Sequence, residues 1–236
     1  MLYQGFFRAT LMLLCFYTFQ ANARPVSYVG GKTAMVETNA VMDVVNAHYT
    51  PSRNYSIGYY GANFRNINTA FNGVGFNYLL KRINTSDAQF NFYFESAIGN
   101  FTKYGNQVVG NNTDNFGGIS DGKNNLGGFA GVAFDGENRR FYVSSESMAW
   151  HKNGMHMLKH SGRLGIAPYV AEYGGLHTWF MVQLDAVPKA MFEQATDTSY
   201  VYTATPLLRF FHDVYLFEVG YNIQRQGPLV HFMVRM

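Results

Sequence analysis

The densest group of potential metal ligands lies in one short segment, where histidines alternate with methionines. Its members are Met148, His151, Met155, His156, Met157 and His160. Imidazole and thioether ligands together suit copper, and thioethers favour the reduced ion. The segment has no regular ligand spacing and no acid or thiol, whereas a metal site needs ligands that converge on one point. We therefore expect no bound metal and no cofactor; the residues that would form a copper site are His151, His156, His160, Met155 and Met157.

A hydrolase would need a nucleophile, a base and an acid that orients the base. His160 and Ser161 form the only adjacent histidine–serine pair, and Glu146 and Glu172 lie in the segments that flank it. Adjacent residues of a strand point to opposite faces of the sheet, so this pair would not be in contact. We therefore expect no catalytic residues, and a lipid-modifying enzyme is the weakest of the functional alternatives.

Three segments alternate between two kinds of side chain, which is the pattern of strands with two different faces. In residues 89–95, Phe90, Phe92 and Phe94 alternate with Gln, Asn, Tyr and Glu. Residues 74–81 and 215–222 repeat this alternation. A helix would not keep the phase, because its faces recur every 3.6 residues. The pattern predicts an all-β chain.

Turn signals divide the chain into twelve predicted strands, with ten as the alternative number. The predicted strands are residues 32–37, 41–49, 55–65, 73–83, 88–101, 126–135, 139–151, 161–172, 176–190, 199–211, 214–223 and 229–236. One set of connections is short, at residues 50–54, 84–87, 136–138, 173–175 and 212–213, and the other includes long loops at 102–125, 152–160 and 191–198. Short periplasmic turns and longer extracellular loops are typical of a closed antiparallel transmembrane β-barrel.

The composition agrees with a sheet that has lipid on one face. Charged residues make up 14% of the chain, well below the roughly 25% of ordinary soluble domains. Aromatic residues reach 17%, and such rings favour the boundary between membrane and water. The net charge of +3 gives no electrostatic footprint for nucleic acid. A sheet in lipid must also close, because the hydrocarbon offers no partners to an open edge.

The first 23 residues have the features of a secretory signal peptide. Arg8 supplies a positive charge, an apolar run follows, and Ala21-Asn22-Ala23 provides small residues for cleavage after Ala23. The only cysteine, Cys15, lies in this segment, so the processed chain would have no disulfide and no thiol chemistry. We expect residues 1–23 to be the signal peptide and residues 24–236 to form one barrel domain.

The chain end resembles the β-signal of bacterial outer-membrane β-barrel proteins. From Leu229 to Met236, the residues Val230, Phe232, Val234 and Met236 fall on one face. The resemblance is to the class as a whole, in which the final residue is usually Phe or Trp, so Met236 departs from the pattern. It implies a location in the cell outer membrane of a Gram-negative envelope, contact with outer-membrane lipid, and recognition by the barrel assembly machinery through the strand from Leu229 to Met236.

The inward faces of such a barrel should carry the charges. The phase of the predicted strands places nine charged side chains toward the lumen: Lys81, Glu95, Arg140, Glu146, Arg163, Asp185, Arg209, Glu218 and Arg235. Twelve strands enclose more space than eight but far less than the water channel of 16 to 18. Unpaired charges in a confined lumen are costly, so we expect these groups to pair.

These features predict a small pore, or an envelope-structural barrel whose polar lumen is charge-paired. As a pore it would pass small solutes or ions, and the mixed signs of the charges predict weak ion selectivity. The alternative is a binding barrel, in which the loop rich in Asn and Gly at residues 102–125, or the histidine–methionine segment, would hold a metal ion or a surface partner.

Overall fold

The computed structural model describes residues 26–103, 125–152, 155–172, 174–191 and 199–236, with the side chain of Met155 left aside. This part of the chain contains twelve strands and two short 3₁₀ turns, at Arg65–Ile67 and Lys189–Met191. The strands are β1 (Lys32–Thr38), β2 (Asp43–Ser52), β3 (Tyr55–Phe64), β4 (Thr69–Asn84), β5 (Ala88–Lys103), β6 (Leu126–Asn138), β7 (Phe141–Lys152), β8 (Met155–Ile166), β9 (His177–Pro188), β10 (Tyr200–His212), β11 (Tyr215–Asn222) and β12 (Gly227–Arg235). Within the described residues, no helix is long and apolar enough to cross a membrane.

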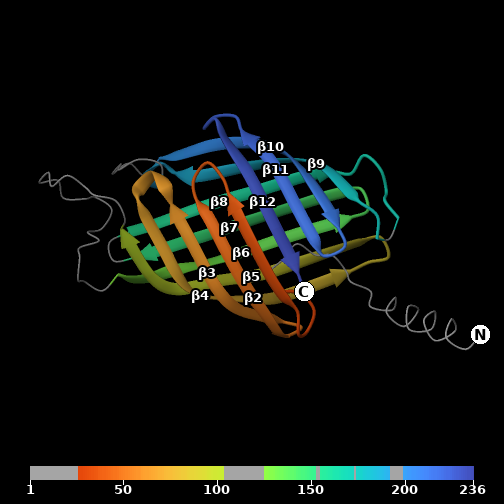
Figure 1. Ribbon diagram of the computed structural model, residues 1–236, viewed down its shortest axis with the longest axis horizontal. Helices are drawn as coiled ribbons and strands as arrows, with labels where there is room; N and C mark the ends of the chain where they lie inside the picture. Colours follow the sequence, from red (N-terminus) through yellow and green to blue (C-terminus); the bar gives the residue numbers. More distant parts are fainter. Residues whose placement is uncertain (1–25, 104–124, 153–154, 173, 192–198) are drawn as a thin grey trace, which may run out of the picture.

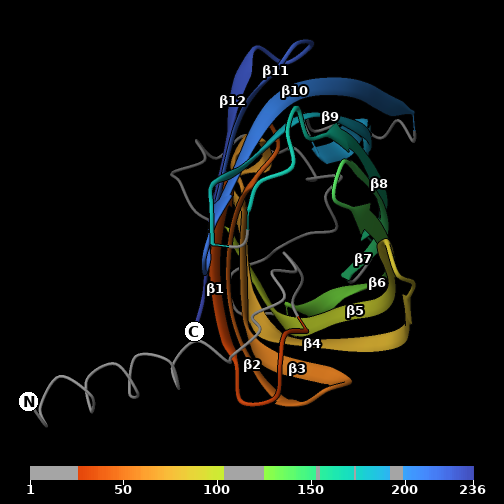
Figure 2. The ribbon, with the colours of Figure 1, turned by 90° about the vertical axis from the view of Figure 1, so that its right-hand side faces the viewer.

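The strands form one closed antiparallel barrel in which each strand pairs with its neighbours in sequence (Figure 1). The ends of the sheet join through β1 and β12, where Val36 is in register with Phe232. Lys32 and Met236 exchange both backbone hydrogen bonds at this junction, at 2.6 and 2.7 Å. In Figure 2 the wall curves from β2 and β3 through β6 and β7 to β11 and β12. The closure leaves no open sheet edge at this seam.

Apolar side chains cover the outside of the barrel, and polar ones lie inside. In β11, Phe217, Val219 and Tyr221 are exposed, whereas the alternating Leu216 and Glu218 are buried. The same arrangement exposes large apolar residues on the other strands, among them Val36, Val74, Val132, Phe180 and Leu184. A soluble β-sandwich would bury these rows against a second sheet. The exposed apolar face therefore suits a hydrocarbon environment.

Both described chain ends lie at the same end of the barrel, together with four short turns. These turns are residues 53–54, 85–87, 139–140 and 213–214; we call this the short-turn end. The opposite end, which we call the long-loop end, has the connections 104–125 and 189–199 and three of four residues each at 39–42, 65–68 and 223–226. The predicted number of strands is confirmed. The predicted difference between the two ends holds for these connections but not for two others: the β7–β8 connection at the long-loop end has two residues, and the β8–β9 connection at the short-turn end has ten.

One predicted strand was placed wrongly. The prediction put a loop at residues 152–160 and a strand at 161–172, whereas β8 is Met155–Ile166. Met157 and Lys159 are buried and alternate with the exposed His156 and Leu158, so the histidine–methionine segment is itself part of a two-faced strand. The strand ends just before Pro168, which has no N–H for a sheet ladder. The connection of residues 167–176 at the short-turn end is consequently longer than the predicted turn at 173–175.

Candidate functional site

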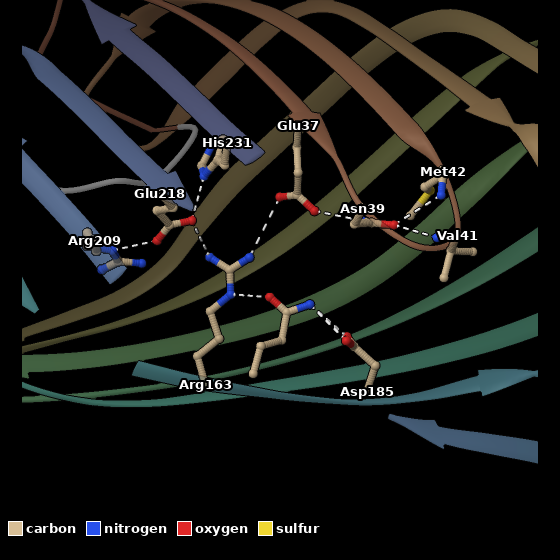
Figure 3. A network of polar contacts seen from close by, with 10 residues as sticks. Glu37, Asn39, Val41, Met42, Arg163, Asp185, Arg209, Glu218 and His231 are labelled. Carbon is tan, nitrogen blue, oxygen red and sulfur yellow. Dashed lines mark hydrogen bonds and ion pairs between the residues drawn. The ribbon is translucent and has the colours of Figure 1, made fainter. Parts of the chain in front are cut away.

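The centre of the lumen is organised around one carboxylate, that of Glu218. The alternation of β11 points this side chain inward, where it is fully buried. Its Oε1 accepts a hydrogen bond from Arg209 Nε at 2.6 Å. Its Oε2 lies 3.0 Å from Arg163 Nη1 and 2.7 Å from His231 Nδ1 (Figure 3). Three basic groups from β8, β10 and β12 therefore meet on a single acidic side chain.

Arg163 connects this cluster to the opposite wall. Its Nη2 lies 3.6 Å from Glu37 Oε2 on β1, and its Nε donates to Gln183 Oε1 on β9 at 2.7 Å. Gln183 in turn donates to Asp185 at 2.9 and 3.0 Å. The network in Figure 3 thus ties β1, β8, β9, β10, β11 and β12 together across the lumen. The guanidiniums of Arg163 and Arg209 balance the carboxylates of Glu37 and Glu218, which offsets the cost of burying each charge.

A cavity of about 160 Å³ lies beside this network. Its walls combine apolar side chains, such as those of Met42, Val44 and Phe129, with polar side chains of both charge signs. The polar ones include Asn46, Glu95, Glu146, Lys159, Arg163 and His231. We call it the chamber. A cavity volume of about 10–15 Å³ is enough for one water molecule, so the chamber has room for a cluster of waters or a small solute. It is smaller than the roughly 300–1,000 Å³ of pockets that bind drug-sized ligands.

Toward the long-loop end the lumen is filled by an apolar cluster around Trp150. The Trp150 ring is almost fully buried, and its centroid lies 4.6 Å from that of Phe129, 5.2 Å from Phe64 and 5.3 Å from Phe71. Tyr60 and Phe129 also line the chamber, so the cluster bounds it on this side. Closely packed aromatic rings of this kind exclude water.

Toward the short-turn end, the residues that precede β1 enter the lumen. Val26 is fully buried and packs with Tyr93 and Ala133, which face inward from β5 and β6. Ser27 and Thr50 are within hydrogen-bonding distance of each other, with 3.1 Å between their hydroxyl oxygens. The chamber therefore lies between an aromatic cluster at one end of the barrel and this N-terminal segment at the other.

Most of the charged residues assigned to the lumen from the sequence lie on its wall. Glu95, Glu146, Arg163 and Arg209 line the chamber, and Asp185 lines a small neighbouring pocket. Glu218 is fully buried, and Arg235 is buried on the inward phase of β12. The charge pairing expected for them is present at Glu218, Arg163 and Arg209.

The structure differs from the sequence expectation at Lys81. A β-bulge between Leu79 and Lys81 shifts the register of β4 against β5, so Lys81 faces Phe92 on the exposed side. Arg82 takes the inward position and donates to Asn91 Oδ1 at 2.7 Å. A bulge adds one residue to a strand and thereby exchanges its faces. Strict alternation along the sequence could not show this.

Arg140 is also not a residue of the lumen wall. It is exposed in the turn between β6 and β7, where its backbone N–H donates to Asn138 Oδ1 at 2.7 Å. The predicted strand began two residues early, and this is why the residue received a strand position.

Sequence reasoning missed three members of the site: Glu37, Lys159 and His231. Lys159 was placed in a loop, because β8 was shifted by six residues. Glu37 and His231 are in register with one another across the β1–β12 seam. His231 lies two and four residues before the inward Met233 and Arg235, so the phase of the last strand was the signal that could have found it.

The potential metal ligands divide between the two faces of the barrel. His151 and His156 are exposed, with 3.1 Å between their Nδ1 atoms, whereas Met157 is buried in the lumen. His160 is exposed on the outer face, where its Nδ1 lies 2.8 Å from Ser147 Oγ. Among the described residues, no group of three or more His, Cys, Asp or Glu could hold a metal ion. The three histidines therefore lie on the outer face and Met157 lies in the lumen, so these four side chains do not meet at one point.

The histidine–serine pair behaves as strand geometry requires. His160 is exposed on the outside, and Ser161 lines the chamber, so the two side chains point apart. The letters of the esterase motif G-x-S-x-G do occur in the sequence, from Gly118 to Gly122. They fall outside the described residues. That motif acts at a strand-to-helix turn, and the described part of the chain has no α-helix.

A closed antiparallel sheet with an apolar exterior and a charged interior defines a transmembrane β-barrel of the bacterial outer-membrane type. Lipid offers no hydrogen bonds, so a sheet crosses a membrane only when it closes. The outer membrane is where such barrels lie.

Comparison with known proteins gives similarity to solved outer-membrane structures. No protein-family model matches the chain, and no curated protein matches it in sequence. The outer membrane protein OprD from Pseudomonas aeruginosa is 14% identical with a TM-score of 0.40, over 88% of this chain and 65% of that one. The KdgM porin in complex with disordered oligogalacturonate is 9% identical with a TM-score of 0.46, over 87% and 97%. OccAB1 from Acinetobacter baumannii is 10% identical with a TM-score of 0.43, over 83% and 57%. The chain thus spans less than two thirds of OprD and OccAB1.

Proposed function

We propose that this protein is a narrow pore of the outer membrane, which passes small solutes or ions through the chamber. The observation that carries the proposal is the chamber itself, a space of about 160 Å³ inside a closed barrel, with charged side chains of both signs on its wall. A barrel with a purely structural role gains nothing from such a space, because filling it with apolar side chains would avoid the cost of burying charges.

The two boundaries of the chamber make it a restricted passage. The cluster around Trp150 separates it from the long-loop end, and Val26 with Tyr93 separates it from the short-turn end. Apolar constrictions in pores control passage by excluding water. Passage through this barrel therefore requires the side chains around Trp150 to move. The charged chamber would be a hydrated intermediate site along the permeation path.

The route of export belongs to the same proposal. Residues 1–23 would act as the signal peptide, and the strand from Leu229 to Met236 would be read by the barrel assembly machinery. Arg24 would then be the first residue of the processed chain, two residues before the buried Val26.

Single-channel recording in planar bilayers tests the pore, with Trp150→Ala as the main variant. We expect the wild-type barrel to give small, infrequent openings with weak ion selectivity, since both signs of charge line the chamber. Trp150→Ala should open more often and conduct several-fold more, because it removes the ring at the centre of the apolar cluster. Phe180→Ala is the matched control: this ring is exposed on the outer face, and its loss should leave the conductance unchanged.

Removal of a buried tryptophan costs about 3–5 kcal/mol, so folding must be monitored by the heat-dependent shift in gel migration. Trp150→Leu is the milder variant if the alanine form does not fold. Silence of the wild type and of every folded Trp150 variant, at all voltages, would rule out the pore.

A further inference from the structure

Two charged residues of the chamber form no direct contact with the network, although the charge of Lys159 lies near enough to Glu37 to attract it. Arg163 and Arg209 are paired with Glu37 and Glu218, whereas Glu146 and Lys159 form no ion pair or hydrogen bond with any described residue. Lys159 is more than nine-tenths buried. A charge held in a confined lumen is costly unless something neutralises it. These two groups are therefore available to the contents of the chamber.

The sheet register places this acid and this base next to each other. Glu146 on β7 is opposite Ser161, and Lys159 on β8 is opposite Met148. Glu146 and Lys159 are thus diagonal neighbours on the inner wall, at a Cα separation of about 7–8 Å. Side chains of this length could meet at that separation, and in the structure they stay unpaired. The space between them suits a small group that offers a positive charge to one and a negative charge to the other.

The opposite wall of the chamber carries polar atoms without partners among the described residues. They are His231 Nε2, Asn46 Oδ1 and Thr33 Oγ1, each on a side chain more than nine-tenths buried. All three residues line the chamber. Buried polar atoms in folded proteins are almost always hydrogen-bonded. Each of these atoms has almost no accessible surface of its own, so a solute in the chamber would reach them only after neighbouring side chains shift.

We propose that the chamber selects a small zwitterion, a solute with an ammonium and a carboxylate on the same carbon atom; the inference rests on the pore function proposed above. The ammonium lies against Glu146 and the carboxylate against Lys159. A solute with only a negative charge would be repelled by Glu146, and a solute with only a positive charge would be repelled by Lys159. An uncharged solute would remove water from both and compensate neither.

Uptake of three matched solutes into proteoliposomes at pH 6 tests this selection. Alanine is the zwitterion, lactate lacks the ammonium, and alaninamide lacks the carboxylate. We expect wild-type uptake of alanine to exceed that of either analogue by at least about tenfold, the effect of one mismatched charge worth 1.4 kcal/mol or more. Glu146→Gln should raise lactate uptake relative to alanine, and Lys159→Met should raise alaninamide uptake.

The double variant Glu146→Lys with Lys159→Glu restores one charge of each sign and should recover the preference for alanine. Lys81→Met, on the exposed side of β4, is the control, and it should leave the relative uptake of the three solutes unchanged. Equal passage of all three solutes, or faster passage of a singly charged one, would overturn the selection of zwitterions and leave the pore intact. Passage of none of them, in any variant, would count against the pore itself.

Discussion

At the scale of single residues, the most consequential position is Glu218. Its side chain is fully buried, and its carboxylate lies within hydrogen-bonding distance of Arg163, Arg209 and His231. A buried charge is tolerated where its partners and hydrogen bonds are complete. Loss of this one charge would therefore leave Arg163 joined only to Glu37 on β1 and Gln183 on β9, and would remove the links to β10, β11 and β12.

We expect Glu218→Gln to destabilise the folded barrel by about 3–5 kcal/mol, because it leaves two guanidiniums without their shared carboxylate. Unfolding by guanidinium in detergent, followed by tryptophan fluorescence, measures the change. Glu146→Gln is the matched comparison, since Glu146 has no partner among the described residues; it should shift stability by about 1 kcal/mol or less. Equal effects of the two substitutions would show that the Glu218 network does not support the fold.

At the scale of the elements, alternation together with turn signals was enough to predict the number of strands and most of their positions. The segments around Phe92, Val74 and Phe217 keep a strict period of two, because one face meets lipid and the other the lumen. The prediction was wrong at β8, where a histidine-rich outer face makes the strand look like a loop. The outer histidines form local pairs, such as His151 with His156, and such pairs arise only after the strands come together.

The site was harder to predict than the strands. Four lumen residues on straight parts of the sheet, Arg163, Asp185, Arg209 and Glu218, follow from the phase of their own strands. Lys81 does not, because the bulge in β4 exchanges the two faces. Which acid meets which base depends on distances across the lumen, and the sequence carries no information on those distances. The apolar cluster at one end was not foreseen either, since its members come from strands far apart in the chain.

The β1–β12 seam gives a test of the topology at this scale. Lys32 and Met236 are a hydrogen-bonded pair, so Val36 and Phe232, four residues along each strand, are of the same type, with Cα atoms about 5.5 Å apart. We expect the double variant Val36→Cys with Phe232→Cys to form a disulfide under mild oxidation, because this separation suits the bond. A shift in migration on non-reducing gels detects it.

The control for this cross-link is Val36→Cys with Val234→Cys, which is two residues out of register. Its Cα atoms are about 7–8 Å apart, beyond the reach of an unstrained disulfide. Efficient cross-linking of the control, or none in the matched pair, would contradict the observed register and with it the closure of the barrel.

At the scale of the whole molecule, the distribution of polarity is the reverse of that in a soluble protein. The interior carries the network around Glu218, and the exterior carries rows of exposed Val, Leu, Ile, Phe and Tyr. Monomeric soluble proteins rarely expose continuous apolar surface of this extent. The stability of this fold therefore depends on the hydrocarbon around it as well as on the network inside.

A charge placed on the outer face measures that dependence directly. Val132 is exposed at the middle of β6, and Ile223 is exposed in the turn at the long-loop end. We expect Val132→Arg to destabilise the barrel in lipid vesicles by about 2–4 kcal/mol and Ile223→Arg by about 0–1 kcal/mol, since the cost of a charge falls from the bilayer centre toward its surface. Urea titration of the vesicle-inserted protein compares them. A soluble barrel would tolerate both, because arginine on a water-facing strand costs little. If both substitutions change the free energy of unfolding by equally small amounts, the apolar face lies in water, and the proposal of a membrane pore is wrong.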